Sequence, residues 1–272
     1  MEKFFVAAIQ IDSQDNKPAN IAKLDYFIDI AKGHGAKLVG MSENVNFIGD
    51  EEGEFENAET IPGPTTDFFC KKAKQHGIWL HCGSIFETTT YKDKLYNSSV
   101  FVNPKGEIVS VYRKIHLFDI DIKNSVSYVE SKTKIPGGEI IVVDTDFAKV
   151  GLSICYDIRF PELYRIMTLR GAEIILVAAA FTLFTGKDHW ETLLRARAIE
   201  NQCYIIAPAQ IGTKPDFQSY ARTLIVDPWG TVIAEASDKE CIVLAEIDLE
   251  YLYKVRTGLP CIKHRKPEIY KW

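Results

Sequence analysis

The chain has 272 residues, of which 46% are hydrophobic and 25% are charged, a composition typical of a soluble globular protein rather than a disordered, fibrous or membrane chain. Its 32 basic and 37 acidic residues give a formal net charge of -5, so no general positive field is available for nucleic acid or an anionic membrane. The longest apolar run, residues 174–181, is far shorter than the roughly 20 residues that span a bilayer.

The cysteines indicate a reducing environment. They are dispersed and form neither a CxxC pair nor a cysteine–histidine cluster with zinc spacing: Cys70, Cys82, Cys155, Cys203, Cys241 and Cys261. Residues 1–4 lead directly into strand-like sequence and carry no secretory signal. We therefore expect reduced thiols in a cytoplasmic protein.

Strand-like and helix-like segments alternate in the first part of the chain. The nearly continuous apolar run at residues 4–11 predicts a strand buried on both faces. A helix is expected from Pro18, because apolar residues recur at helical spacing until Gly33. The next segments are predicted as a strand, a helix and a strand, at 37–41, 64–76 and 78–85. This order is typical of an α/β protein.

Two segments are predicted as antiparallel hairpins, because each has a proline and a glycine in its turn. The paired strands are 97–102 with 107–112, and 224–227 with 231–234. Residues 102–109 and 226–233 match at the Val, Pro and Gly positions and in a closing apolar pair. The match indicates either an internal repeat with two similar halves or only the common shape of two type I turns.

Strands and helices also alternate between the hairpins. Strands are expected at 140–143, 150–154, 174–178 and 204–207. One helix is expected at 161–169, and a second carries an apolar stripe of Trp190, Leu193, Leu194, Ala198 and Ile199. No stretch has the composition of a linker, so we expect a single domain over residues 1–272, with two mixed sheets packed together under helix layers.

Cys155 is the cysteine most suggestive of chemistry. The chain has no dinucleotide fingerprint and no P-loop, and Cys155 stands where a serine hydrolase elbow needs its second glycine. Cys155 follows an apolar strand and precedes Pro161, so its thiol would lie at the carboxyl edge of a sheet, near a helix N-terminus that favours thiolate. The alternative is a buried structural cysteine, which is the interpretation we adopt for the other five.

A nucleophilic cysteine needs a base and a group that stabilises the oxyanion. None of the six histidines stands in a pattern that nominates it as the base. Glu43 follows strand 37–41, and Lys114 lies at the end of the hairpin strand 107–112. On the residues alone, Glu43 is either a site residue or a solvated loop charge, and Lys114 is either a site residue or a charge that protects a sheet edge.

Several motifs together resemble those of the nitrilase superfamily of carbon–nitrogen hydrolases. The Glu, Lys and Cys motifs correspond to Glu43, residues 112–114 and residues 155–162, and further matches lie at 190–191 and 195–201. Their order and separations agree, and the resemblance covers essentially the whole chain. It implies an α/β fold, a four-layer αββα sandwich with two mixed sheets. Tyr156-Asp157, where nitrilases proper usually carry Trp-Glu, disfavours a nitrile substrate.

Residues 112–119 and 130–133 resemble the branch of this superfamily that contains the omega-amidases and the deaminated-glutathione amidases. The resemblance implies hydrolysis of the terminal amide of a small oxo acid, of the 2-oxoglutaramate or deaminated-glutathione type, to a carboxylate and ammonia. It also implies a homodimer. The alternatives are an N-carbamoyl-amine amidohydrolase with the same triad and a catalytically idle interaction protein on the same scaffold.

The resemblance also implies a mechanism. Glu43 would take the thiol proton of Cys155, whose sulfur attacks the amide carbon. Lys114 and the backbone N–H of Tyr156 would bind the developing oxyanion. Glu43 would then protonate the departing ammonia and activate the water that hydrolyses the thioester. Glu130 would help to position Lys114 and the substrate, unless it is a solvated loop charge. The scheme needs no metal and no cofactor.

An anionic oxo acid needs a cation for its remote carboxylate. Arg159, four residues after the nucleophile, is the candidate because a guanidinium binds a carboxylate at two points. Phe181 and Thr185 match positions that line the substrate pocket in the omega-amidase branch. The alternatives are an ion pair of Arg159 with Asp157 or Glu162, a plain core role for Phe181 and an ordinary loop hydroxyl for Thr185.

Overall fold

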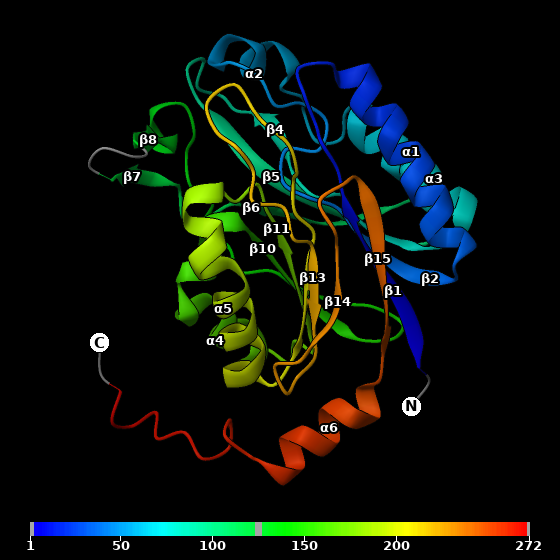
Figure 1. Ribbon diagram of the computed structural model, residues 1–272, viewed down its shortest axis with the longest axis vertical. Helices are drawn as coiled ribbons and strands as arrows, with labels where there is room; N and C mark the ends of the chain where they lie inside the picture. The colour runs from blue at the N-terminus through cyan, green and yellow to red at the C-terminus, as the bar shows by residue number, and fades with distance from the viewer. Residues whose placement is uncertain (1–2, 123–126, 271–272) are drawn as a thin grey trace.

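Two large β-sheets face each other, and helices cover their outer faces (Figure 1). The computed structural model describes residues 3–122 and 127–270. Residues 1 and 2, with which the predicted strand-like start begins, lie outside this part. The layers, from one side to the other, are helices, sheet, sheet and helices, which confirms the predicted sandwich. Within the described residues, no helix is long and apolar enough to cross a membrane.

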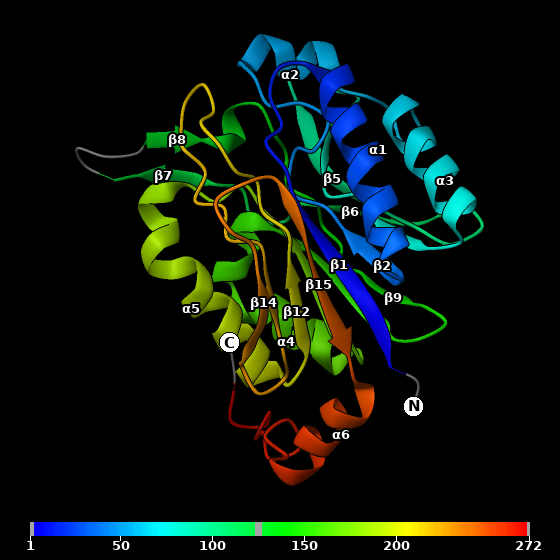
Figure 2. The same cartoon turned by 45° about the vertical axis from the view of Figure 1, so that its right-hand side comes forward.

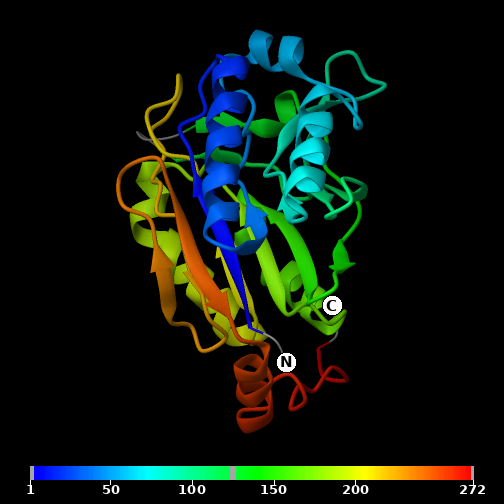
Figure 3. The same cartoon turned by 90° about the vertical axis from the view of Figure 1, so that its right-hand side faces the viewer.

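The first sheet has seven strands in the order β15-β1-β2-β3-β5-β4, with β6 beside β5. Its strands are β1 (Phe4–Gln10), β2 (Ala36–Gly40), β3 (Trp79–His81), β4 (Ile85–Thr88), β5 (Leu95–Val102), β6 (Ile108–Arg113) and β15 (Cys241–Ile247). Helices α1 (Lys17–Gly33) and α3 (Pro64–His76) lie side by side over its outer face, as Figure 3 shows. The Asn16 side chain caps α1, and Gly77, with φ of 61°, ends α3 as predicted.

The second sheet has six strands in the order β14-β13-β12-β11-β10-β9. Its strands are β9 (Val142–Asp144), β10 (Lys149–Ile154), β11 (Ile174–Ala178), β12 (Tyr204–Ala207), β13 (Leu224–Val226) and β14 (Val232–Glu235). Helices α4 (Pro161–Leu169) and α5 (Leu183–Asn201) cover it. A separate two-stranded sheet of β7 (Asp119–Asp121) and β8 (Ser127–Val129) projects near one end of α5.

The two large sheets repeat one topology. In each, three parallel strands with helices between them are followed by an antiparallel hairpin: β1-β2-β3 with β5-β6, and β10-β11-β12 with β13-β14. Each hairpin also has a register shift at the matched valine, Val102 in one and Val226 in the other. The similarity therefore extends beyond the turns to whole halves, which confirms the internal repeat.

Strand β1 shows why one chain segment serves two cores. Val6 and Ala8 belong to the large apolar cluster that also contains residues of β10 to β13. Ala7 and Ile9 belong to the cluster beneath α1 and α3. Because successive side chains of a strand point to opposite faces, the apolar run buries both faces at once. Strand β15, which was not predicted, pairs antiparallel with β1 and closes that edge, as Figure 2 shows.

Two predictions about secondary structure are wrong. The single strand expected at 78–85 is interrupted at Gly83, where φ is 59° and a Cβ would lie 2.0 Å from the carbonyl oxygen of Ser42. Only glycine fits there, and the chain turns from β3 into β4. Ile199 does not share the buried stripe of α5 but is 50% exposed, because nine residues of helix place it about 180° away from Trp190.

Helices α2 (Glu51–Asn57) and α6 (Leu249–Gly258) were also not predicted. The Asp50 side chain caps α2 and the Asp248 side chain caps α6. Helix α2 packs beside β4, and α6 follows β15 at the opposite end of the molecule (Figure 1).

Candidate active site

The predicted site residues come from both halves of the molecule. Glu43 follows β2 and Lys114 follows β6, whereas Cys155 follows β10 directly. Glu130 begins a single 3-10 turn (Glu130–Lys132) after β8. The carboxyl ends of parallel strands are the usual place for ligands in α/β sheets. Here the ends of β2 and β10, one from each sheet, supply two of the four side chains.

Cys155 occupies a turn of unusual conformation. It starts a short 3-10 helix (Cys155–Arg159) and has a φ of 47°, in the left-handed region that non-glycine residues rarely adopt. Such a conformation costs on the order of 1 kcal/mol or more and persists only where the surroundings hold it. The turn presents the cysteine to a cavity at the end of the strand.

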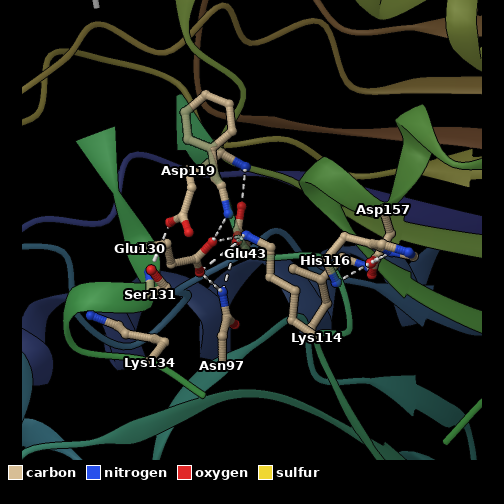
Figure 4. A network of polar contacts seen from close by, with 12 residues as sticks. Glu43, Asn97, Lys114, His116, Asp119, Glu130, Ser131, Lys134 and Asp157 are labelled. Atoms are coloured by element: carbon tan, nitrogen blue, oxygen red, sulfur yellow. Dashed lines mark hydrogen bonds and ion pairs between the residues drawn. The ribbon is translucent and has the colours of Figure 1, made fainter. Parts of the chain in front are cut away.

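Asp157 supplies the contacts that hold this turn. Its buried carboxylate accepts hydrogen bonds from the backbone N–H of Ile154 (2.8 Å) and the hydroxyl of Tyr112 (2.6 Å). It also contacts His116, whose backbone N–H donates at 3.0 Å and whose Nδ1 lies at 2.7 Å (Figure 4). Tyr112 and His116 flank Lys114 in the chain. Asp157 therefore joins the nucleophile turn to the segment that carries Lys114.

Two carboxylates surround the ammonium group of Lys114. Its Nζ lies 3.0 Å from Oε1 of Glu43, and 3.1 Å and 2.9 Å from the two oxygens of Glu130. The backbone N–H of Phe118 donates to Oε2 of Glu130 at 2.7 Å. That of Ala180 donates to Oε2 of Glu43 at 2.9 Å. Glu130 is thus a buried partner of Lys114, and the alternative of a solvated loop charge is wrong.

Burial and charge set the protonation states of this cluster. Burial by itself lowers the pKa of Lys114, but the charges of Glu130 and Glu43 outweigh it and raise that pKa well above its usual value. Lys114 therefore remains an ammonium ion. It is almost fully buried, so the expectation of a charge that protects a sheet edge is wrong.

The Cys155 thiol is neutral at rest. Burial raises its pKa well above the usual value and the Glu43 charge adds to this, although Lys114 and the N–H of Ala180 act in the opposite direction. The local expectation of a thiolate favoured by a helix N-terminus is therefore wrong. A nucleophilic sulfur at this position must lose its proton to a base during the reaction.

A cavity of about 110 Å³ opens at the cysteine. Seven of the eight predicted site residues line it: Glu43, Lys114, Glu130, Cys155, Tyr156, Phe181 and Thr185. Arg159 is not among the lining residues but lies beside two of them. Its guanidinium carbon is 5.2 Å from the ring centre of Phe181 and 5.7 Å from that of Tyr156. Seven of the predicted residues therefore meet at one cavity, and Arg159 is not among the residues that line it.

The alternatives for the substrate residues are also answered by the structure. Within residues 3–122 and 127–270, Arg159 forms no ion pair with Asp157 or Glu162, and its Nη1 lies 3.2 Å from Nδ1 of His189. Phe181 packs on Trp190 in the core and faces the cavity as well. Thr185 is buried, with its hydroxyl 3.1 Å from that of Thr182.

Sequence reasoning missed several residues of the site. The Nδ2 of Asn97, in β5, donates to Oε1 of Glu43 at 2.8 Å and lies 3.5 Å from Oε1 of Glu130. Its signal was a strongly polar side chain in a buried strand. The cavity is also lined by Tyr128 of β8 and by Phe217, which lies on a loop tethered by Lys214. Nothing in the sequence around Phe217 or Tyr128 indicates a site residue, because only the fold of the chain brings them to the cavity.

The described residues contain no group of three His, Cys, Asp or Glu side chains placed to hold a metal ion. Three charged side chains of the cavity, those of Glu43, Lys114 and Glu130, pair with one another. Glu43 and Glu130 share Lys114, which leaves an ammonium ion and a carboxylate beside a neutral thiol. Such an arrangement can remove the thiol proton and stabilise a negative oxygen on an attacked carbonyl.

Comparisons with known proteins agree with this chemistry. A family model described as carbon-nitrogen hydrolase matches residues 5–257. A deaminated glutathione amidase from Synechocystis sp. is 39% identical over 269 residues, with 97% of this chain and 99% of that protein covered. The omega-amidase NIT2 from Homo sapiens is 38% identical over 272 residues, with 99% and 98% covered.

A solved structure shows the same fold. Saccharomyces cerevisiae Nit3, described as a member of branch 10 of the nitrilase superfamily, superposes with a TM-score of 0.89 at 32% identity. The match covers 97% of this chain and 97% of that one. The nitrilase-like sandwich predicted from the motifs is therefore confirmed over nearly the whole chain.

Proposed function

Because the chain belongs to the carbon-nitrogen hydrolase family, we propose that it is an amidase that hydrolyses small oxo-acid amides through a thioester on Cys155. The observation that carries this proposal is the meeting of Glu43, Lys114 and Cys155 at one small cavity, from three segments far apart in the chain. The names of the similar proteins, omega-amidase and deaminated glutathione amidase, support an oxo-acid amide as the substrate.

In the first half-reaction, Glu43 takes the proton of the neutral Cys155 thiol while the sulfur bonds to the amide carbon. The carbonyl oxygen gains a negative charge, which the ammonium of Lys114 and the backbone N–H of Tyr156 stabilise. One such donor changes the rate by about 100- to 1,000-fold. The carbonyl re-forms as the carbon–nitrogen bond breaks, and the proton on Glu43 passes to the departing nitrogen.

In the second half-reaction, water attacks the thioester. Glu43 accepts a proton from the water, and Lys114 again stabilises the negative oxygen. The carbon–sulfur bond breaks, the sulfur is protonated again, and the oxo acid leaves as a dicarboxylate. The leaving nitrogen is ammonia for 2-oxoglutaramate, whereas in deaminated glutathione the amide nitrogen carries a peptide remainder and leaves as an amine.

Four residues complete the proposed substrate site. Phe181 and the Tyr156 ring form walls of the cavity, and Thr185 lines it as well. We assign Arg159 to the remote carboxylate of the substrate, because its guanidinium lies over both of these rings at the cavity wall. A guanidinium binds carboxylate at two points, which suits an anionic oxo acid.

Replacement of the nucleophile tests the proposal. We expect Cys155→Ala to abolish ammonia release from 2-oxoglutaramate, because no other group can form the thioester. Cys203→Ala is the matched control: Cys203 is also a buried cysteine, but it lies in the apolar core outside the cavity lining. Ammonia release and the free oxo acid are both measured. Turnover by Cys155→Ala, or release of carbon dioxide with the ammonia, would refute the proposal.

We also propose that the chain is one domain that works as a homodimer in the cytoplasm. One apolar cluster contains residues from both halves, among them Phe4 and Ile205, which supports a single domain. Apolar side chains exposed on the second half, such as Leu169 and Ile199, support a dimer contact there. The six free cysteines support a reducing compartment. Sedimentation of the purified protein measures the oligomeric state.

A further inference from the structure

Asn97 makes an unusual pair of contacts in the buried cluster. Its Nδ2 lies 2.8 Å from Oε1 of Glu43 and 3.5 Å from Oε1 of Glu130. The Nζ of Lys114 lies 3.0 Å and 3.1 Å from the same two oxygens. Two nitrogen donors and two carboxylate oxygens therefore form a closed ring of four atoms (Figure 4). The side chain of Asn97 is thus a second bridge, beside Lys114, between the two glutamates.

The charges explain why a second bridge matters. Two buried carboxylates share a single ammonium, so their mutual repulsion pushes them apart unless further donors hold them in place. The amide of Asn97 cannot lose or gain a proton in the ordinary pH range and donates to the ionised carboxylates. Such donation holds the two carboxylates in place without changing the charge of the cluster.

The same contacts distinguish the two oxygens of Glu43. Oε1 accepts hydrogen bonds from both Lys114 and Asn97. Oε2 accepts a hydrogen bond from the backbone N–H of Ala180, and the Cys155 side chain also contacts the Glu43 carboxylate. This N–H also acts on the Cys155 thiol. Oε2 therefore lies on the side of the nucleophile and keeps a lone pair free to receive its proton.

The orientation of the Asn97 amide is determined by its surroundings. Its Oδ1 is buried and has no hydrogen-bond partner among the described residues. Reversal of the amide would direct this oxygen at the two carboxylates, which cannot donate to it while they are ionised. An unsatisfied buried acceptor is costly. Its retention here is consistent with a role for the opposite, donating end of the side chain.

We propose that Asn97 is a positioning residue for the reaction: it holds Oε1 of Glu43 so that Oε2 receives the thiol proton, and it holds Glu43 and Glu130 together around Lys114. The inference rests on the proposed function, in which Glu43 is the base. Asn97 does not line the cavity and acts only through the glutamates.

Two substitutions at Asn97 distinguish a role in hydrogen-bond donation from a role in packing. Asn97→Leu keeps the branched outline of the side chain but removes both donors, and we expect kcat for 2-oxoglutaramate to fall about 10- to 100-fold with little change in KM. Asn97→Asp keeps the shape but adds a third carboxylate, so its loss exceeds that of Asn97→Leu and deepens as the pH rises.

Ser99→Ala is the matched control. Ser99 is buried two residues further along β5, and its hydroxyl contacts Nε2 of His81 at 2.9 Å, outside the cavity. We expect this variant to lose stability without a change in the shape of the pH profile. Circular dichroism and thermal unfolding of all three variants show which of them are folded, and Asn97→Asp, which has the shape of the natural residue, serves if Asn97→Leu does not fold.

The outcomes separate this inference from the proposed function. If Asn97→Asp is as active as the natural protein, or milder than Asn97→Leu with an unchanged pH profile, Asn97 serves only packing and the inference is wrong. Glu43→Gln is measured in parallel. If Glu43→Gln retains turnover, the base is not Glu43 and the proposed function fails, whatever the Asn97 variants do.

Discussion

The two halves of the molecule have the same strand order but contribute different chemistry. Glu43 comes three positions after the end of β2 at Gly40, and Phe181 comes three positions after the end of β11 at Ala178. The corresponding strand ends therefore carry the proposed base in the first half and an apolar wall of the cavity in the second. Neither half holds the proposed machinery alone, because Cys155 belongs to the second half and Lys114 to the first.

This difference shows how two halves with the same topology can supply different groups to one reaction. The repeat determines where strands end, and each end provides a position next to the boundary between the sheets. Which side chain occupies that position is free to differ between halves, since the strand itself is held by its core residues. Contacts between the halves then become the sensitive part of the site, such as the N–H of Ala180 on Glu43.

The largest effect is expected where one residue ties the halves together. Asp157→Asn replaces an acceptor for several donors by an amide, so the hydrogen bonds to Tyr112 and His116 are weakened. We expect kcat to fall about 10- to 100-fold, with a smaller change in KM, because hydrogen bonds to a charged group are lost. Steady-state kinetics with 2-oxoglutaramate measure both constants.

Asp146→Asn is the control for this change. Asp146 accepts a hydrogen bond from the indole of Trp79 at 2.6 Å, away from the cavity. We expect it to keep its kcat. If Asp157→Asn also keeps its kcat, the nucleophile turn does not need the hydrogen bonds of Asp157 to Tyr112 and His116. The contact between the two halves would then not matter for the reaction.

A smaller effect is expected at the substrate end of the second half. Arg159→Met removes the cation assigned to the remote carboxylate, so we expect KM for 2-oxoglutaramate to rise about tenfold at a similar kcat. The KM for pentanamide, a neutral amide of the same length, should not change. An equal rise for both amides would show that Arg159 only supports the rings of Phe181 and Tyr156.

The smallest effect concerns the pH dependence of stability, to which one position contributes in the first half but not in the second. Residue His81 of β3 corresponds to Ile206 of β12, because the neighbouring residues Leu80 and Ile205 pair with the matched valines of the two hairpins. Burial lowers the pKa of His81 to about 3, whereas a histidine in an unfolded chain has a pKa of about 6.5. Only the first half therefore carries a titrating group at this position.

The sign of the effect follows from proton binding. Below about pH 6.5 the unfolded chain binds a proton that the folded chain refuses until about pH 3, so the free energy of unfolding falls as the pH drops through this window. His81→Gln should flatten this dependence in denaturant titrations from about pH 7 to about pH 4. His34→Gln, at an exposed position, should leave it unchanged. An equally steep fall in His81→Gln would contradict the assignment.

Local signals predicted a large part of the fold. The continuous apolar run at residues 4–11, the glycine that ends α3 and the two proline–glycine turns act within a few residues, so they can be interpreted without knowledge of distant contacts. The break at Gly83 could not be found in this way. It depends on a close approach of Ser42, which is distant in sequence.

The site shows the same division. The motifs around Glu43, Lys114 and Cys155 identified the proposed reacting groups, and the structure places all three at one cavity. The sequence did not reveal the bridge of Asn97 between two glutamates or the position of Arg159 beside the rings of Tyr156 and Phe181. Both depend on how β5, β8 and β10 pack against one another.

The sequence by itself determined the layered α/β fold, its repeated hairpins and the family to which its motifs belong, because each of these is encoded in local patterns of residues. Only the tertiary structure decided that Cys155 is a neutral thiol, that Glu130 is buried against Lys114 and that Asn97 joins the cluster. The physical reason is that pKa values and hydrogen bonds in a buried site depend on burial and on charges that only folding brings together.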